Sequence, residues 1–163
     1  MRAMTAVGWV YRMEVKPMST TTTDDHEELV AEYFTAWTDQ ESTDFPDILA
    51  EDFSGTLSDP TGSEIQWDAE RLRDTWAESF QTREDPQVEI HTIVADEDRV
   101  MSHITYSYTH VEEEYGVSPT GNRIEVEEYF TFHIQNGEIV AMHNLINHVK
   151  RLKQLGIEIP VDS

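Results

Sequence analysis

The sequence of 163 residues contains no cysteine, only three lysines and no long run of apolar residues. Without cysteine there can be no disulfide framework and no thiolate nucleophile or metal ligand. No apolar run approaches the ~20 residues that a membrane-spanning helix needs, so we expect no membrane span. The small number of basic residues, 11 against 33 acidic ones, also argues against nucleic acid as a partner, because phosphate backbones bind cationic surfaces.

The acidic excess gives a formal net charge of −22. Repulsion of this size opposes folding at low salt, but molar salt screens charges over a Debye length of ~3 Å. The acidic residues are spread along the chain rather than clustered, which favours adaptation to a salt-rich cytoplasm over an acidic patch for a basic partner. We therefore expect a cytoplasmic, halophilic protein.

The first 17 residues differ from the rest, since they carry three basic side chains and one acidic one. Met18 is followed by Ser-Thr-Thr-Thr-Thr-Asp-Asp, which is typical of a natural chain start. The apolar segment 4–11 is short for a signal peptide, and Thr5 and Gly8 interrupt it. We interpret residues 1–17 as a flexible or mis-started extension, and residues 18–163 as one domain with enough apolar residues for a core.

Three helices are predicted in the first half of the chain. Asp24 can cap a helix over residues 25–39, Asp44 begins a short helix with Pro46 in its first turn, and Asp68 caps a helix over about 68–82. Their aromatic residues recur at helical spacing and are expected in the core.

The pattern then changes to strand-like alternation over 88–95, 100–114, 124–134 and 138–146, with tight turns at 96–98 and 136–137. A short helix ended by Gly156 closes the chain. Helices followed by hairpins predict an α+β fold in which three N-terminal helices pack on a curved antiparallel sheet of four or more strands. Such a cone encloses a pocket. We expect aromatic side chains to line it: Tyr33, Trp37, Trp76, Phe80, Tyr106, Tyr108 and Phe130.

Alternation along the strands predicts which polar residues face that pocket. In the strand from 124 the even positions are apolar except for Glu128. A single carboxylate among apolar side chains is the arrangement that prepares a general acid or base, although a bulge would put it at a wet rim. In the strand from 100 the even positions place His110 at the inner end. In the last strand His143 and Asn147 are expected to face inward with Ile139.

The spacing of the histidines gives no argument for a metal site. His110, His143 and Glu128 could in principle form a two-His, one-carboxylate site, but His143 and Asn147 would lie about 13 Å apart on an extended strand.

Three segments carry a resemblance to the SnoaL-like polyketide cyclase (ester cyclase) family of the nuclear transport factor 2-like superfamily. Tyr108-Thr-His110 is similar to the family's Gly-Thr-His strand end, and Val117-Ser-Pro-Thr-Gly-Asn-Arg123 to the following loop. Asn136-Gly-Glu-Ile-Val140 with Lys153-Gln-Leu-Gly156 resembles the closing strand and helix. The resemblance covers about residues 24–158 and implies a cone-shaped fold, a homodimer or higher homo-oligomer, a small hydrophobic ligand, and no metal or cofactor.

The resemblance also implies departures from the family pattern. The family's acid–base aspartate falls on Asn147, its tryptophan four positions earlier on His143, and an arginine on His103. An amide cannot act as a general base near neutral pH.

Three hypotheses follow. In the first, His143 or Glu128 abstracts a proton next to a carbonyl of a small hydrophobic compound, and His110 and Asn147 stabilise the enolate, giving cyclisation or isomerisation. In the second, the same pocket binds a small apolar ligand without changing it. In the third, the pocket is vestigial and the outer face of the sheet assembles copies of the chain, although His103, Thr105, Tyr129 and Thr131 make that face polar.

Overall fold

The structure is a computed structural model that describes residues 20–160, with side chains from residue 23 onward. Its elements are three helices and six strands: α1 (Thr20–Ala36), β1 (Leu49–Ser58), β2 (Glu64–Trp67), α2 (Ala69–Thr82), β3 (Arg83–Asp96), β4 (Arg99–His110), β5 (Arg123–Gln135), β6 (Glu138–Ile146) and α3 (His148–Gln154). The strands form one sheet in the order β2-β1-β6-β5-β4-β3. The segment predicted as an N-terminal extension lies outside the described residues.

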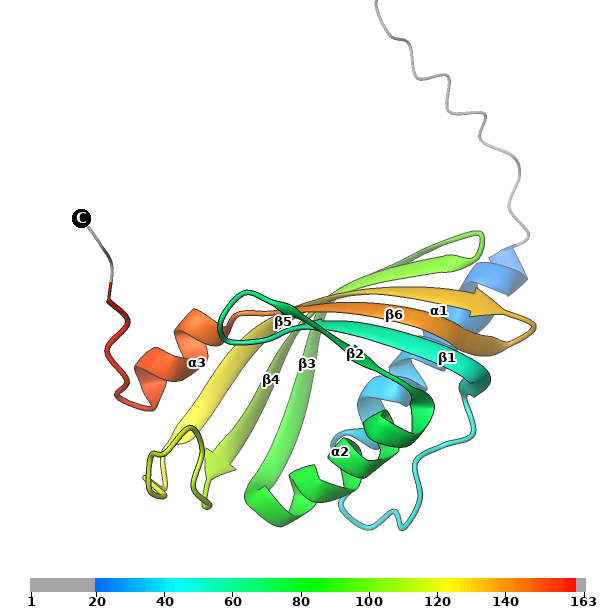
Figure 1. Ribbon diagram of the computed structural model, residues 1–163. Helices are drawn as coiled ribbons and strands as arrows, with labels where there is room; N and C mark the ends of the chain where they lie inside the picture. Colours follow the sequence, from blue (N-terminus) through cyan, green and yellow to red (C-terminus); the bar gives the residue numbers. More distant parts are fainter. Residues whose placement is uncertain (1–19, 161–163) are drawn as a thin grey trace, which may run out of the picture.

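The long strands curve, and α1 and α2 lie on the same side of them, while α3 continues from the end of β6 (Figure 1). The two helices turn their apolar stripes toward the sheet and bury Val30, Phe34, Leu72 and Trp76. Asp68 caps α2, as predicted, by accepting a hydrogen bond from the backbone N–H of Arg71 at 2.8 Å. None of the described helices is long and apolar enough to cross a membrane.

Of the three predicted N-terminal helices, the second, which was to begin at Asp44, was wrong. Residues 44–48 are a loop, residues 49 and 50 already belong to β1, and α3 is the third helix of the described chain. β1 alternates between buried Phe53, Gly55 and Leu57 and outward residues, but a glycine in the middle conceals this alternation in the sequence. A Cβ at Gly55 would lie 3.2 Å from the ring of Phe53, so a larger residue there would require that ring to shift.

The prediction of a wholly antiparallel sheet needs a second correction, because β1 pairs with β6 in parallel. The hairpins β3-β4 and β5-β6, and the β4-β5 pair, are antiparallel as expected. The even positions of β4 and β5 are buried along the whole of both strands, which confirms the predicted inner face.

The register of β6 differs from the prediction because of a bulge. Ile134 pairs with Ile139 and His133 with Ala141, so Val140 is an extra residue in β6. Beyond this bulge the two faces of the strand are exchanged relative to strict alternation. Met142 and Asn144 are buried, and His143 is exposed.

The closing helix ends as the sequence predicts. Gly156 has φ +81°, its N–H donates to the carbonyl of Lys153, and the N–H of Ile157 donates to that of Leu152. This pair of bonds is a Schellman motif, which requires a left-handed residue after the helix. α3 packs against the beginning of β5, where the side chain of Gln154 accepts the N–H of Glu125 and donates to its carbonyl, and Leu155 is buried.

Candidate active site

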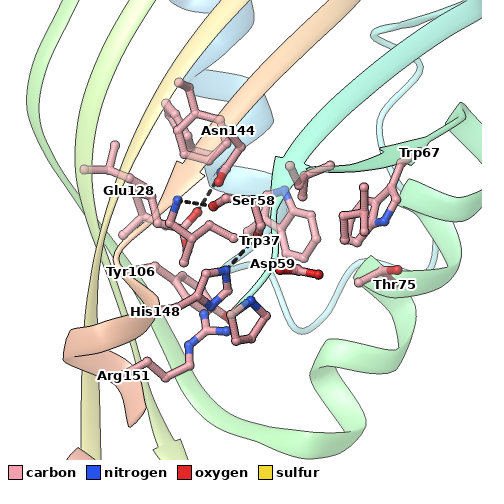
Figure 2. Close-up of a pocket in the computed structure, with 18 of the residues that line it drawn as sticks. Trp37, Ser58, Asp59, Trp67, Thr75, Tyr106, Glu128, Asn144, His148 and Arg151 are labelled. Atoms are coloured by element: carbon pink, nitrogen blue, oxygen red, sulfur yellow. Dashed lines mark hydrogen bonds between the residues drawn. The ribbon is translucent and has the colours of Figure 1, made fainter. Parts of the chain in front are cut away.

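A cavity of about 270 Å³ lies between the curved sheet, α1 and α3. Its wall is mostly apolar, and Figure 2 shows the polar residues that interrupt it. They come from the end of β1, from β4, β5 and β6, and from α3: Ser58, Asp59, Tyr106, Glu128, Asn144, His148 and Arg151. This volume is close to the lower end of the ~300–1,000 Å³ typical of ligand pockets, so the cavity suits a small molecule.

Glu128 is the acidic group of the inner sheet face. It extends from the middle of β5, and its residue is 8% exposed. The Nδ2 of Asn144, on the neighbouring strand β6, donates a 2.8 Å hydrogen bond to its Oε2 (Figure 2). No donor of the described residues bonds to its Oε1. One oxygen of the carboxylate is therefore held in place while the other remains free to accept a proton from a ligand.

His148 forms a second polar point of the wall, at the start of α3. Its Nε2–H donates to the backbone carbonyl of Ser58 at 2.7 Å, which leaves Nδ1 as a lone-pair acceptor with no partner among the described residues. Burial lowers the pKa of His148, and the nearby Arg151 charge lowers it further, although the bond to Ser58 and the charges of Glu128 and Asp59 act in the opposite direction. The imidazole is thus neutral at neutral pH.

Two tyrosines, Tyr33 and Tyr106, line the same cavity. Burial raises the pKa of Tyr33, and the charge of Glu128 adds to this. Burial also raises the pKa of Tyr106, with Glu128 adding to the shift and Arg83 partly offsetting it. Both residues therefore keep their protons, and the buried hydroxyl of Tyr106 has no hydrogen-bond partner among the described residues. It can donate to a ligand oxygen.

Two arginines complete the wall near α3. Arg83, at the junction of α2 and β3, lies over the rings of Tyr108 and Tyr106, at 4.6 and 5.5 Å from their centroids. Arg151 is 5% exposed, and its closest carboxylate is that of Glu114, at 3.8 Å. The cavity therefore has a carboxylate in its middle and guanidinium groups toward one end.

The structure separates the predicted site residues. Glu128 lies in the cavity wall together with four of the predicted aromatic residues, Tyr33, Trp37, Tyr106 and Phe130. His143 does not, because the bulge at Val140 turns it to the outer face, where it lies 3.7 Å from Glu64. The inward orientation predicted for His143 was wrong.

Asn147 also lies away from the cavity wall. It is the N-cap residue of α3, where its side-chain oxygen accepts the N–H of Lys150 at 3.1 Å. The prediction that it faces inward was wrong because strand β6 ends at Ile146 and the chain turns there. Asn147 therefore has a helix-capping role, and the amide next to Glu128 belongs to Asn144.

His110 is buried, as predicted, but it is not part of the cavity wall. Its Nδ1 accepts the backbone N–H of Thr120 at 3.2 Å and so ties the 111–122 loop to the end of β4. Trp76, Phe80 and Tyr108 likewise belong to the core or its margin rather than to the wall. The ring of Tyr108 instead packs against the guanidinium of Arg83.

Sequence reasoning missed the polar residues Asn144, His148, Arg151 and Arg83. Asn144 could not be found because a bulge in β6 leaves no reliable sequence signal. His148, Arg151 and Leu155 do carry a signal, since their spacing of three and four residues places them on one face of a helix. Among the described residues, no group of three or more His, Asp or Glu side chains could hold a metal ion.

Comparison with known proteins fits this geometry. Residues 27–155 match the family described as SnoaL-like polyketide cyclase. The chain belongs to this family. A search of curated protein sequences finds no match.

Solved structures share the fold of this SnoaL-like chain at low identity. AclR, a putative hydroxylase from Streptomyces galilaeus, is 24% identical with a TM-score of 0.72, over 86% of this chain and 91% of that one. IdmH, a putative polyketide cyclase from Streptomyces antibioticus, is 24% identical with a TM-score of 0.68, over 80% and 97%. An M. tuberculosis LEH-like epoxide hydrolase is 18% identical with a TM-score of 0.61, over 82% and 91%. Proteins of this fold thus include several described as small-molecule enzymes.

Proposed function

We propose that this SnoaL-like protein is a cofactor-independent enzyme that moves a proton next to a carbonyl group of a small, largely apolar compound, with Glu128 as the base. The product would be an isomer or a newly closed ring. One observation carries the proposal: a buried carboxylate in an apolar cavity is hydrogen-bonded by Asn144 at one oxygen and has no donor among residues 23–160 at the other.

The reaction begins when Glu128 Oε1 takes the proton from the carbon next to the carbonyl. The electron pair of the broken C–H bond forms an enolate, and the hydroxyl of Tyr106 donates a hydrogen bond to its oxygen. Glu128, now a carboxylic acid, returns the proton to another carbon of the same molecule to give an isomer. In a ring closure the enolate carbon instead attacks a second carbonyl, and the proton goes to the resulting alkoxide.

His148 acts here as a neutral acceptor rather than as an acid. Because its Nε2–H is bonded to Ser58, its Nδ1 can accept a hydrogen bond from a hydroxyl of the substrate. It therefore orients the substrate and is not the proton donor in this mechanism.

The test is hydrogen–deuterium exchange at the carbon next to the carbonyl, followed by proton NMR in D₂O with 4-acetylbenzoate as the probe. The wild-type protein should exchange the methyl protons faster than buffer does. Glu128→Gln should lower the rate by about 10²–10⁴-fold, since that is the usual contribution of a general base. The exchange rate of Glu128→Asp should lie between those of the wild type and Glu128→Gln, because the side chain keeps its carboxylate but is shorter by one methylene.

Circular dichroism and calorimetric titration of the probe separate this result from misfolding. A Glu128→Gln protein that is folded and exchanges at the wild-type rate contradicts the role of Glu128. A wild-type protein that binds the probe and never exchanges it supports the alternative function, a non-catalytic binding protein on the same fold.

We propose further that the protein is a homodimer that pairs through the outer face of the sheet. Support comes from four large side chains exposed across β3, β4, β5 and β6: Val94, Met101, Tyr129 and Leu145. Sedimentation velocity should then give a dimer for the wild type and a monomer for Met101→Lys. A monomeric wild type contradicts this assembly.

We also propose that the protein works in a salt-rich cytoplasm. The net charge of −22 supports this, because screening relieves the repulsion among its acidic groups. The melting temperature should rise between 0.1 and 2 M KCl, and a melting temperature that falls over this range contradicts the proposal.

A further inference from the structure

The wall of the cavity near α3 contains a fixed positive charge at Arg83. Its guanidinium lies over the ring of Tyr108, 4.6 Å from the centroid, and over that of Tyr106, 5.5 Å from the centroid. Both rings belong to the buried inner face of β4. Stacking against two packed rings restricts the orientation of the guanidinium plane, and such contacts favour arginine over lysine.

This charge has no counter-ion among the side chains that the structure describes. No carboxylate of residues 23–160 lies within 4 Å of a nitrogen of the Arg83 side chain, although acidic residues outnumber basic ones three to one. Arg123, by contrast, is paired with Asp85 at 3.2 Å. Arg71, Arg73 and Arg99 also have no carboxylate within 4 Å among the described side chains, but of these four unpaired arginines Arg83 is the one that lines the cavity.

A second cation lies in the same wall. Arg151 is 5% exposed, and its Nε has no hydrogen-bond partner among the described residues. The carboxylate of Glu114 is 3.8 Å from its Nη1, but this carboxylate also accepts the hydroxyl of Tyr108 at 2.5 Å. A buried guanidinium with a free N–H requires an acceptor, and the cavity offers a place for one.

We infer that this end of the cavity binds a carboxylate of the substrate, so that the enzyme acts on a small keto acid whose carboxylate lies against Arg83 and Arg151. The inference deepens the proposed function and rests on it for the reaction at the other end of the molecule. The planar fork of a guanidinium donates two parallel N–H groups, which match the two oxygens of a carboxylate.

Register sets the distance between the two ends of such a molecule. Glu128 pairs with Ile104, and Tyr106 and Tyr108 follow at two and four residues farther along β4. A strand advances by about 3.3 Å per residue, so Arg83 lies roughly 7–13 Å from Glu128 along the strand. A keto group and a carboxylate on opposite sides of one six-membered ring span a distance of this order. The volume of about 270 Å³ also suits a molecule of that size.

The experiment compares two probes of the same shape and different charge, 4-acetylbenzoate and 4-acetylbenzamide. Isothermal titration calorimetry gives their dissociation constants, and proton NMR in D₂O gives the exchange rate of their methyl protons. The wild-type protein should bind the carboxylate at least tenfold more tightly than the amide. Equal affinity, or tighter binding of the amide, overturns the inference.

Variants of Arg83 assign the preference to this residue. Arg83→Gln should weaken 4-acetylbenzoate binding at least tenfold and leave 4-acetylbenzamide binding within twofold. Arg83→Lys should retain part of the preference, because it keeps the charge and loses the fork. Arg99→Gln, an exposed arginine outside the cavity wall, removes the same charge and should change neither constant. An Arg83→Gln protein that weakens both probes equally contradicts the inference.

A third probe, 4-acetylphenyl phosphate, tests the choice of anion. Weaker binding than 4-acetylbenzoate supports a carboxylate site, and tighter binding overturns the assignment in favour of a phosphate site. The same measurements distinguish a failure of the carboxylate site from a failure of the proposed function. Charge-selective binding without exchange in the wild type removes the catalytic role of Glu128, whereas exchange of both probes without charge selectivity removes the carboxylate site.

Discussion

Polar side chains are in different environments on the two faces of the sheet. On the outer face many are partly exposed and several are paired. His91 bonds to Thr105 and His133 to Asp98. His103 stacks on Tyr129, and its Nε2 lies 3.8 Å from Glu127 without a hydrogen-bond partner among the described residues. On the inner face polar groups are few, and several have no hydrogen-bond partner in the described part of the chain, among them the hydroxyl of Tyr106 and Nδ1 of His148. Unpartnered groups are costly when buried, so their concentration around one cavity indicates a ligand site.

The difference between the two faces is clearest for residues that are adjacent in the sequence. Glu127 and Glu128 lie on opposite faces of β5, and His143 and Asn144 on opposite faces of β6. Each pair differs little in position along the chain and greatly in environment. Burial and partners, rather than residue type, therefore decide which member can act on a ligand.

The largest expected effect is on folding, and it comes from the core of the inner face. Phe132 is fully buried and its ring lies 5.1 Å from that of Tyr33 on α1. Phe132→Ala should lower the free energy of unfolding by about 3–5 kcal/mol. Thr131→Ala, on the outer face, should cost less than about 1 kcal/mol. Urea denaturation measures both, and equal losses would mean that the two faces are not distinguished by packing.

The positions of Phe132 and Thr131 could be predicted from the sequence, because strict alternation persists through β4 and β5. The same rule failed in β6, where one extra residue exchanges the faces. A bulge depends on how two strands pair, and a single strand does not reveal it. Glu128 could be found because alternation holds up to its position, and Asn144 could not because it follows the bulge.

The next effect concerns activity. Asn144→Leu keeps the size of the side chain but removes the donor to Glu128, so the carboxylate is no longer oriented. Its exchange rate with 4-acetylbenzoate should fall about 10–100-fold, because removing a hydrogen bond to a charged group costs about 1.5–3 kcal/mol. His143→Phe is the matched change on the outer face and should leave the rate within twofold. A larger loss in His143→Phe than in Asn144→Leu would restore the original prediction for His143.

The other errors also have physical causes. β1 was missed because Gly55 interrupts its apolar alternation and because Pro46 and Asp47 are typical of a helix start. Asn147 was placed on a strand because it is the single residue between the end of β6 at Ile146 and the start of α3 at His148. The unpaired Arg83 lacks any sequence signal, since it reaches the cavity wall only through its position over Tyr106 and Tyr108 of the neighbouring strand β4.

The smallest effect is on the pH dependence of stability. The pKa of His148 is lower in the folded protein than the ~6.5 of an unfolded chain, chiefly through burial. Below about pH 6.5 the unfolded chain therefore binds a proton that the folded protein does not, and stability falls as the pH decreases. Urea denaturation from pH 7.5 to 5 should show a smaller loss for His148→Gln than for the wild type. Parallel profiles would mean that His148 titrates normally.

The central claim is that Glu128, and not its neighbour Glu127, accepts the substrate's proton. Methyl-proton exchange of 4-acetylbenzoate by Glu128→Gln and Glu127→Gln under identical conditions tests it most directly. The account predicts that Glu127→Gln keeps the wild-type rate within twofold and that Glu128→Gln loses at least 10²-fold. Equal rates in the two variants, with both proteins folded, would contradict it.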